Sequence, residues 1–363
     1  MTPTSKLLDL QVLDELIVTV VVDNATDALS SIGPEIPQLS EIFFLLNSVP
    51  PTRQHKGRDC ITVFDQMCMA CHGLSVLISG RRGAEVKTAL VDAGPNGEVW
   101  LDNARRLGID LAAIDILFLS HWHWDHSGGI PTVVDAISKA KRGKGIRMPV
   151  MVDVHPDRPD RRGIQLPGGP MVMLPDEPTI DAIENSGGHV VPHRDAHLFG
   201  DAFFGSSGMI ARTTAYETGL PGHHSFQGDH GFEDPLISDE RLVLANVRGR
   251  GVSVFSACSH AGIVNACLQA QVLVPGIRVD LVLGGYHLAG ATVEDRISST
   301  TEDLADLINP RIVAPGHCTG WRANSALAER FAPNAFAPSV VGARYVLTSK
   351  PPNVDSPQKD VQP

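Results

Sequence analysis

Short apolar runs recur along this chain of 363 residues, and their lengths and β-branched content predict buried strands. The candidate strands are at residues 16–22, 73–79, 88–91, 111–120, 149–154, 252–257, 280–283 and 311–314. The stretches between them predict helices at residues 99–107, 132–141, 263–273 and 293–307. Strands and helices therefore alternate in two series, which indicates an α/β fold.

The segments outside these elements have a different composition. Residues 1–13 are expected to form a poorly fixed arm, and residues 348–363 a disordered polar tail. Residues 26–61 are rich in Pro and Ser and predict a long surface excursion. Residues 155–235 are rich in Pro, Gly and His, so we expect a long irregular insertion that recognises substrate. We interpret residues 1–347 as a single domain that carries this insertion.

Four metal-ligating side chains follow one predicted strand within six positions. The stretch FLSHWHWDHSGG contains His121, His123, Asp125 and His126. In an extended chain the first three side chains alternate onto one side and the fourth points to the other, so a tight turn after Trp124 would gather all four. The alternative is a set of ordinary surface histidines, and the density of ligand-type side chains argues against it.

Other candidate residues also come directly after apolar strands. His260 lies in CSHAG, His287 in GGYHL and His317 in PGHCTG, and Asp92 follows the strand at residues 88–91. Strand ends along one edge of a sheet form a single rim. We therefore expect these separate segments to converge on one cleft.

These motifs resemble those of the metallo-β-lactamase fold superfamily of metal-dependent hydrolases. The pattern HxHxDH carries the likeness, together with HGLS at residues 72–75, CSHAG and PGHCTG. The stretches HGLS, CSHAG and PGHCTG narrow the resemblance to the branch named for 7,8-dihydropterin-6-methyl-4-(β-D-ribofuranosyl)aminobenzene-5′-phosphate synthase. The likeness covers residues 15–347. It implies a four-layer αβ/βα sandwich, in which two mixed β-sheets are flanked by helices.

The resemblance also implies a dinuclear metal site, with ions about 3.5–4 Å apart. Six side chains are assigned to the two divalent ions, the first held by His121, His123 and His260 and the second by Asp125, His126 and His317. Zinc is the expected metal, with iron and manganese as alternatives, because His and Asp suit borderline and harder ions. The predicted catalytic residues are Asp125, Asp92, which would brace the metal loop, and His287.

Two assignments stay open at this point. His223 and His224, in the stretch LPGHHSFQGDHG, compete with His260. We prefer His260, because it follows a strand whose end is fixed by sheet packing, and we expect His223 and His224 to be mobile loop residues. Tyr286 and His287 would either hydrogen-bond substrate or form a partly buried polar pair.

The cysteines change this picture little. All six are scattered through a long chain without a secretory signal, so no disulfide framework is expected. Cys258 and Cys318 adjoin the predicted ligands and are interpreted as packing residues. CMACH at residues 68–72 matches the pattern of covalent haem attachment, but a second chemistry beside a complete hydrolase motif is not expected.

Composition limits the partners. With 43% hydrophobic and 20% charged residues the chain has the balance of a soluble globular protein, and no apolar run reaches the length of a membrane helix. The formal net charge of −11 argues against a nucleic-acid surface and hence against a nuclease. We expect a cytoplasmic protein that acts on a small molecule.

The predicted function is hydrolysis by a metal-activated water of an ester, a phosphoester or a related substrate. One alternative is a dihydropterin-type transferase or synthase that releases diphosphate, as the branch name implies. Another is a binding protein that retains the fold with little turnover. The branch's GEIPR stretch is GMIAR here at residues 208–212, and this departure leaves the substrate open.

Overall fold

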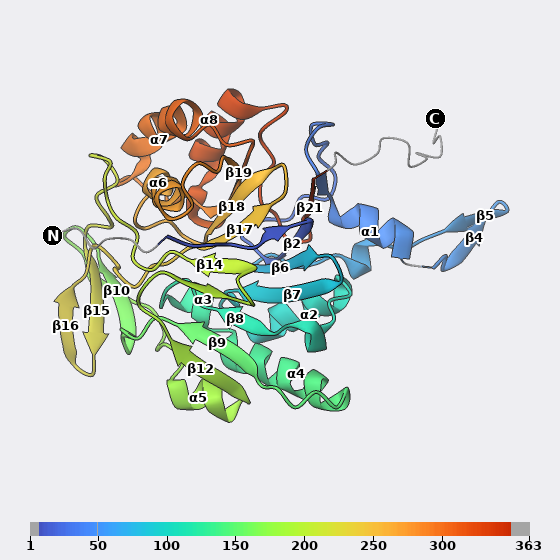
Figure 1. Ribbon diagram of the computed structural model, residues 1–363, viewed down its shortest axis with the longest axis horizontal. Coiled ribbons are helices and arrows are strands. Elements are labelled where there is room, and N and C mark those ends of the chain that lie inside the picture. The colour runs from blue at the N-terminus through green and yellow to red at the C-terminus, as the bar shows by residue number, and fades with distance from the viewer. Residues whose placement is uncertain (1–6, 49, 350–363) are drawn as a thin grey trace.

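Two mixed sheets lie face to face in the computed structural model, which describes residues 7–48 and 50–349 (Figure 1). The first sheet has the order β12-β9-β8-β7-β6-β2-β21-β3. Its strands are β2 (Glu15–Val22), β3 (Gln38–Leu39), β6 (Ser75–Arg82), β7 (Glu85–Val91), β8 (Ile116–Phe118), β9 (Val150–Val154), β12 (Gly188–Pro192) and β21 (Arg344–Thr348).

The second sheet has the order β13-β14-β17-β18-β19-β20, and β1 pairs with β17 at its side. Its strands are β1 (Val12–Leu13), β13 (His197–Phe199), β14 (Phe204–Ser206), β17 (Val243–Val247), β18 (Gly251–Ser256), β19 (Val279–Gly285) and β20 (Ile312–Gly316). The apolar runs predicted at residues 252–257, 280–283 and 311–314 correspond to its last three strands.

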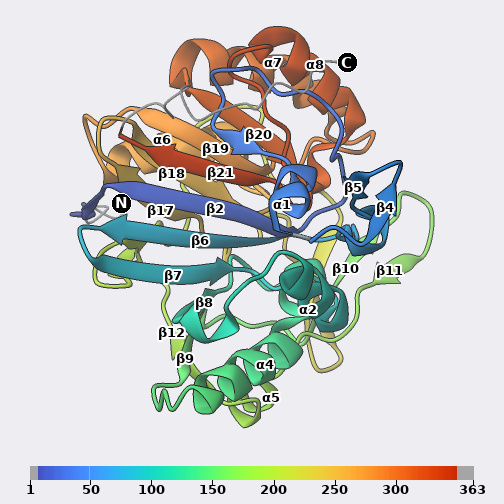
Figure 2. The ribbon, with the colours of Figure 1, turned by 90° about the vertical axis from the view of Figure 1, so that its right-hand side faces the viewer.

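Helices cover the outer face of each sheet (Figures 1 and 2). On the first sheet lie α2 (Gly97–Arg106), α4 (Ile130–Gly143) and α5 (Ile180–Asn185), and on the second α6 (Ile263–Leu273), α7 (Ile297–Asp303) and α8 (Trp321–Phe331). The buried apolar residues form three clusters, one between the sheets and one beneath each helical layer. The predicted four-layer αβ/βα sandwich is confirmed.

Parallel pairing aligns the strand ends that matter for the site. β7, β8 and β9 are parallel neighbours, and so are β18, β19 and β20. In parallel strands the carboxyl ends meet at the same edge of the sheet. The polar residues that follow these strands therefore gather at one rim, as the sequence predicted.

Residues 155–235 contain more regular structure than expected. Besides α5 and strands of the two large sheets, they form a separate sheet of β10 (Arg161–Gln165), β11 (Met171–Met173), β15 (His223–Gln227) and β16 (His230–Glu233). The hairpin of β15 and β16 was not predicted, because its strands carry His, Ser, Gln and Gly in place of an apolar run.

The N-terminal segment corrects a second expectation. Residues 7–13 are not a loose arm: Leu8, Leu10 and Leu13 are buried, and β1 pairs with β17. Of the predicted tail at residues 348–363, Thr348 is the last residue of β21, and residues 350–363 lie outside the described residues.

The remaining elements are short. The excursion after β2 contains α1 (Glu41–Ser48) and a projecting hairpin of β4 (Arg53–His55) and β5 (Arg58–Cys60) (Figure 1). The short helical turns are η1 (Phe64–Gln66), η2 (Leu111–Ala113), α3 (Trp124–Ser127), η3 (Glu294–Arg296), η4 (Leu304–Ile308) and η5 (His317–Thr319).

Candidate metal centre

The HxHxDH motif turns sharply just after β8, as predicted. Trp124 begins the single helical turn α3, which also contains Asp125 and His126. His121 and His123 precede this turn, and all three imidazoles are buried. The motif therefore presents its side chains in two groups at the rim of the two sheets.

Three imidazole nitrogens meet in the first group. His121 Nε2 lies 2.9 Å from His123 Nδ1, and His260 Nε2 lies 3.2 Å and 3.1 Å from these two atoms. The three nitrogens around a tetrahedral zinc ion would lie about 3.3–3.4 Å apart, given metal–nitrogen bonds of about 2.0–2.1 Å. The group thus has nearly the spacing of a three-histidine metal site.

Hydrogen bonds determine which nitrogen of His121 and His123 faces this group. The Ser120 hydroxyl donates to Asp92, so its oxygen accepts from His121 Nδ1 at 2.9 Å. His223 donates from Nδ1 to the Asp234 carbonyl, so its Nε2 accepts from His123 Nε2 at 2.9 Å. His121 Nε2 and His123 Nδ1 are therefore the unprotonated atoms that point inward.

Asp125, His126 and His317 form the second group. Asp125 Oδ2 lies 3.7 Å from His126 Nε2 and 3.3 Å from His317 Nε2. The outer nitrogen of His126 donates to Asp92 Oδ2 at 2.7 Å, and that of His317 donates to Asn24 Oδ1 at 3.1 Å. Both inner nitrogens therefore face the carboxylate of Asp125.

A metal ion fits these donors. His126 Nε2 and His317 Nε2 are buried and have no hydrogen-bond partner among the described residues. Three imidazole nitrogens at hydrogen-bond distance, two of them fixed as acceptors, cannot all satisfy one another with protons. One cation in each group would take these nitrogens as ligands, so the residues present fit the expected metal.

The pKa values agree with metal binding by the first group. Burial lowers the pKa of His121, His123 and His260 well below its usual range, so these imidazoles are neutral. Neutral imidazole is the form that ligates metals.

In the second group, unlike the first, Asp125 and His126 are charged. Burial alone would lower the pKa of His126, but the carboxylates of Asp125 and Asp92 outweigh it and raise the pKa to about 9. Burial likewise disfavours ionised Asp125, yet His126 and His317 hold its pKa well below the usual range. Metal binding here would displace a proton from His126.

Asp92 has the position expected of a bracing residue. Its carboxylate is fully buried and accepts from the Ser120 amide at 2.7 Å, the Ser120 hydroxyl at 2.8 Å and His126 Nδ1 at 2.7 Å. Through these contacts it orients one imidazole of each group. Its role in metal affinity stays a prediction.

Several supporting side chains were not recognised in the sequence. Asp23 accepts from the His317 amide at 2.8 Å, and burial raises the pKa of Asp23 to about 6. Glu240 accepts from the amides of His260 and Ala261, both at 2.7 Å. Asp23 follows a strand as Asp92 does, which was the available signal, whereas no motif marks Glu240.

The structure also places the competing histidines. His223 is buried at the start of β15 and contacts His123 from outside the three-nitrogen group. His224 is the next residue of β15, and its Nδ1 lies 3.0 Å from the Gly222 carbonyl oxygen. The expectation that both are loop residues is wrong, because both belong to β15. His223 accepts a hydrogen bond from His123 and so orients that imidazole.

Tyr286 and His287 differ from each other. The Tyr286 hydroxyl is buried and donates to the Val282 carbonyl at 2.9 Å, so this tyrosine does not reach a substrate. His287 is half-buried, its ring centroid lies 4.4 Å from that of His260, and its Nδ1 lies 3.6 Å from Cys258 Sγ. Substrate contact by His287 stays a prediction.

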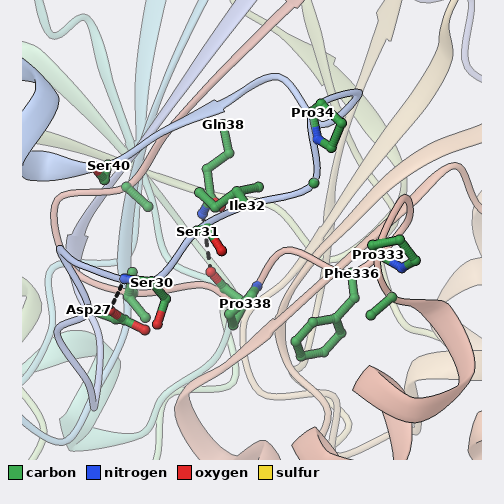
Figure 3. Close-up of a pocket in the computed structure, with 14 residues that line it drawn as sticks. Asp27, Ser30, Ser31, Ile32, Pro34, Gln38, Ser40, Pro333, Phe336 and Pro338 are labelled. Carbon is green, nitrogen blue, oxygen red and sulfur yellow. Dashed lines mark hydrogen bonds between the residues drawn. The ribbon is translucent and has the colours of Figure 1, made fainter. Parts of the chain in front are cut away.

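Access to the centre is on the side of Asp125 and His72. The Asp125 side chain is 21% exposed and the His72 side chain 70%, and His72 Nε2 lies 3.4 Å from Asp125 Oδ2. A separate cavity of about 490 Å³ is lined by residues of the segments 27–40 and 332–343, including Gln38 and Pro338 (Figure 3). None of the six predicted ligands lines that cavity.

Comparisons with known proteins concern the family and the fold of the chain. A family model described as the metallo-beta-lactamase superfamily matches residues 70–238, which include the HxHxDH motif and Asp92. The crystal structure of Tm1679, described as a metal-dependent hydrolase of the beta-lactamase superfamily, matches with a TM-score of 0.62 at 19% identity, over 91% of this chain and 98% of that one. This second likeness concerns the fold.

Two curated relatives come from Methanocaldococcus jannaschii. One is named 7,8-dihydropterin-6-methyl-4-(beta-D-ribofuranosyl)-aminobenzene-5'-phosphate synthase and is 29% identical over 264 residues, 72% of this chain and 85% of the relative. The other is an uncharacterised protein, 26% identical over 262 residues, 72% of this chain and 88% of the relative. The resemblance seen in the motifs is confirmed.

The described part of the chain contains no helix that is both long and apolar enough to cross a membrane.

Proposed function

We propose that this chain, which matches the metallo-beta-lactamase superfamily model over residues 70–238, is a metal-dependent hydrolase of an ester, a phosphoester or a related small molecule. The observation that supports this most is the convergence of His121 Nε2, His123 Nδ1 and His260 Nε2 within 3.2 Å. Two of these atoms are unprotonated because of their outer hydrogen bonds. Such a preorganised set of lone pairs is costly to bury unless a cation occupies it.

The chain's residues divide the work of the proposed centre. His121, His123 and His260 would hold one divalent ion, and Asp125, His126 and His317 a second, with zinc as the expected metal. Bound ions would lower the pKa of a water molecule and polarise the bond under attack. Asp92 and Asn24 fix the orientation of His126 and His317.

Substrate would approach beside Asp125. This carboxylate is the member of the second group that reaches solvent, and His72 lies next to it. We expect a small molecule as the substrate, because the net charge of −11 does not favour a polyanion such as RNA. His72 is therefore placed to contact a substrate that lies beside Asp125.

A synthase that releases diphosphate is a second candidate, supported by the name of the relative that is 29% identical. Ile210 and Arg212 match the branch's GEIPR stretch, but the first is buried in the core beneath α6 and the second donates to the Leu236 carbonyl. Met209, which replaces the acid, is exposed. Ile210 and Arg212, which match the branch, thus have structural contacts in this chain. Met209, which differs from the branch, lies on the surface.

The test begins with metal analysis of protein purified without added metal. Phosphodiester, phosphomonoester, lactone and thioester substrates are then assayed, together with the pterin and ribofuranosyl aminobenzene phosphate pair. We expect bound metal and turnover of at least one ester. The double variant His121→Ala, His123→Ala should lose the ion of the first group and the activity, and keep its fold. Diphosphate release without ester hydrolysis would favour the synthase, and bound metal without any turnover would favour a binding protein.

A further inference from the structure

Two thiols and an imidazole lie side by side at the rim, beside the six proposed ligands. Cys258, His287 and Cys318, here called the thiol cluster, each lie two residues beyond the end of a strand. The strands are β18, β19 and β20, which are adjacent and parallel. Equal offsets from three aligned strand ends place the three side chains in one row.

The distances within this row suit a metal ion. Cys258 Sγ lies 3.6 Å from His287 Nδ1 and 3.1 Å from Cys318 Sγ. Around a tetrahedral zinc ion a thiolate sulfur and an imidazole nitrogen would lie about 3.6 Å apart, and two thiolate sulfurs about 3.8 Å. The first distance already fits, and the second requires only a small opening of the two cysteine side chains.

The backbone at the end of β19 is shaped around the cluster. A side chain at Gly285 would place its Cβ 2.6 Å from Cys318 Sγ, so glycine is needed to leave room for the sulfur. His287 has φ 47°, a conformation that costs a non-glycine residue energy. A strained residue that turns its imidazole toward a thiol suggests a function for that contact.

We propose that the thiol cluster is a further metal site, which takes a thiophilic ion through Cys258 Sγ, Cys318 Sγ and His287 Nδ1. Thiolate ligands select soft and borderline ions, whereas the six His and Asp ligands suit harder ones. On binding, both thiols lose a proton and form metal–sulfur bonds. The site goes beyond the proposed hydrolase, because it uses none of the six ligands assigned there.

Cadmium is the probe, because a cadmium–thiolate bond gives an ultraviolet charge-transfer band that histidine and carboxylate ligands do not give. The full-length protein, kept reduced, is titrated with Cd²⁺. We expect the band to saturate at one equivalent and to disappear in Cys258→Ser and in Cys318→Ser. His287→Ala should weaken Cd²⁺ binding at least about 10-fold, because losing a direct ligand costs no less than losing an outer partner of a ligand.

Two other cysteines provide matched controls. Cys267 is fully buried in α6, and Cys71 lies next to His72 in the CMACH stretch. Cys267→Ser and Cys71→Ser should keep the band. Loss of the band in Cys71→Ser, or its persistence in Cys258→Ser or Cys318→Ser, would overturn the proposal.

The double variant His121→Ala, His123→Ala separates this site from the histidine centre, since Cys258 Sγ also lies within 4.8 Å of ligand atoms of His121 and His126. A separate site predicts that this variant keeps the cadmium band. If the folded variant loses it, the sulfur belongs to the histidine centre and the proposal is wrong. Should a cysteine variant not fold, alkylation of wild-type protein decides: Cd²⁺ must protect Cys258 and Cys318, and unprotected thiols refute the site.

Discussion

Single hydrogen bonds determine which nitrogen of each imidazole faces the proposed metal centre. Ser120, His223 and Asn24 accept from the outer nitrogens of His121, His123 and His317, and Asp92 accepts from that of His126. The sequence motif predicts which residues come together, because its spacing is local. It does not predict their outer partners, which lie up to 293 positions away.

Asp92→Asn tests the bracing role. The amide keeps one oxygen acceptor but presents an NH₂ group where the carboxylate now accepts from Ser120 or His126. We expect most of the metal to remain, with metal affinity or activity lowered about 10–100-fold. Metal titration followed by kcat/KM measurement checks this. Unchanged affinity and activity would show that the contacts only support the fold.

His260→Ala and His223→Ala should differ in metal binding, because the first removes a proposed ligand and the second removes the hydrogen-bond acceptor of the ligand His123. His260→Ala should abolish binding of one ion, measured as metal per chain. His223→Ala should retain the ion with affinity lowered about 10–100-fold, since His123 loses the acceptor that fixes its tautomer. His224→Ala is the control and should bind normally. Full loss in His223→Ala with retention in His260→Ala would reverse the assignment.

At the scale of elements, sequence reasoning succeeded where a buried strand ends in a polar motif. Strands β8, β18, β19 and β20 are mostly apolar and almost entirely buried, because the opposite sheet covers one face and the helices the other. Sequence reasoning did not predict β15 and β16, because these strands are stabilised by pairing within a small separate sheet and not by an apolar run. His223 was consequently assigned to a loop.

Glu177 connects the insertion to the metal loop, and it predicts a pH effect. Ser127 donates to its buried carboxyl group, and burial raises the pKa of Glu177 to about 7. The folded chain therefore keeps a proton that the unfolded chain loses near pH 4.5. This contribution to stability is present below about pH 4.5 and is lost as the pH rises to about 7.

Glu177→Gln should remove that pH dependence. Relative to wild type, the variant should gain on the order of 1–3 kcal/mol in the free energy of unfolding between pH 5 and pH 8. Urea denaturation at both pH values measures it. Glu184→Gln, at an exposed position of α5, is the control and should show no such gain. An equal pH profile for wild type and Glu177→Gln would show that the carboxyl group ionises normally.

At the scale of the whole molecule, three apolar clusters stabilise the fold, and the proposed ligands at the rim of the sheets belong to none of them. The cluster between the sheets and the two beneath the helices consist of apolar side chains of the sandwich itself. The motifs and the layer pattern were sufficient to predict this arrangement. The N-terminal segment was not predicted, since its short LDLQVL pattern shows no length that distinguishes a strand from a loose arm.

The N-terminal segment nevertheless joins two layers, which yields a stability prediction. Leu13 belongs to the cluster between the sheets and is fully buried, whereas Leu7, six residues earlier, is 60% exposed. Leu13→Ala removes buried methyl groups and leaves a cavity, so it should lower the free energy of unfolding by about 2–5 kcal/mol. Leu7→Ala is the matched control and should change it by less than about 0.5 kcal/mol. Denaturant unfolding of both variants measures the difference. Equal free energies of unfolding for the two variants would show that residues 7–13 form the loose arm predicted from the sequence.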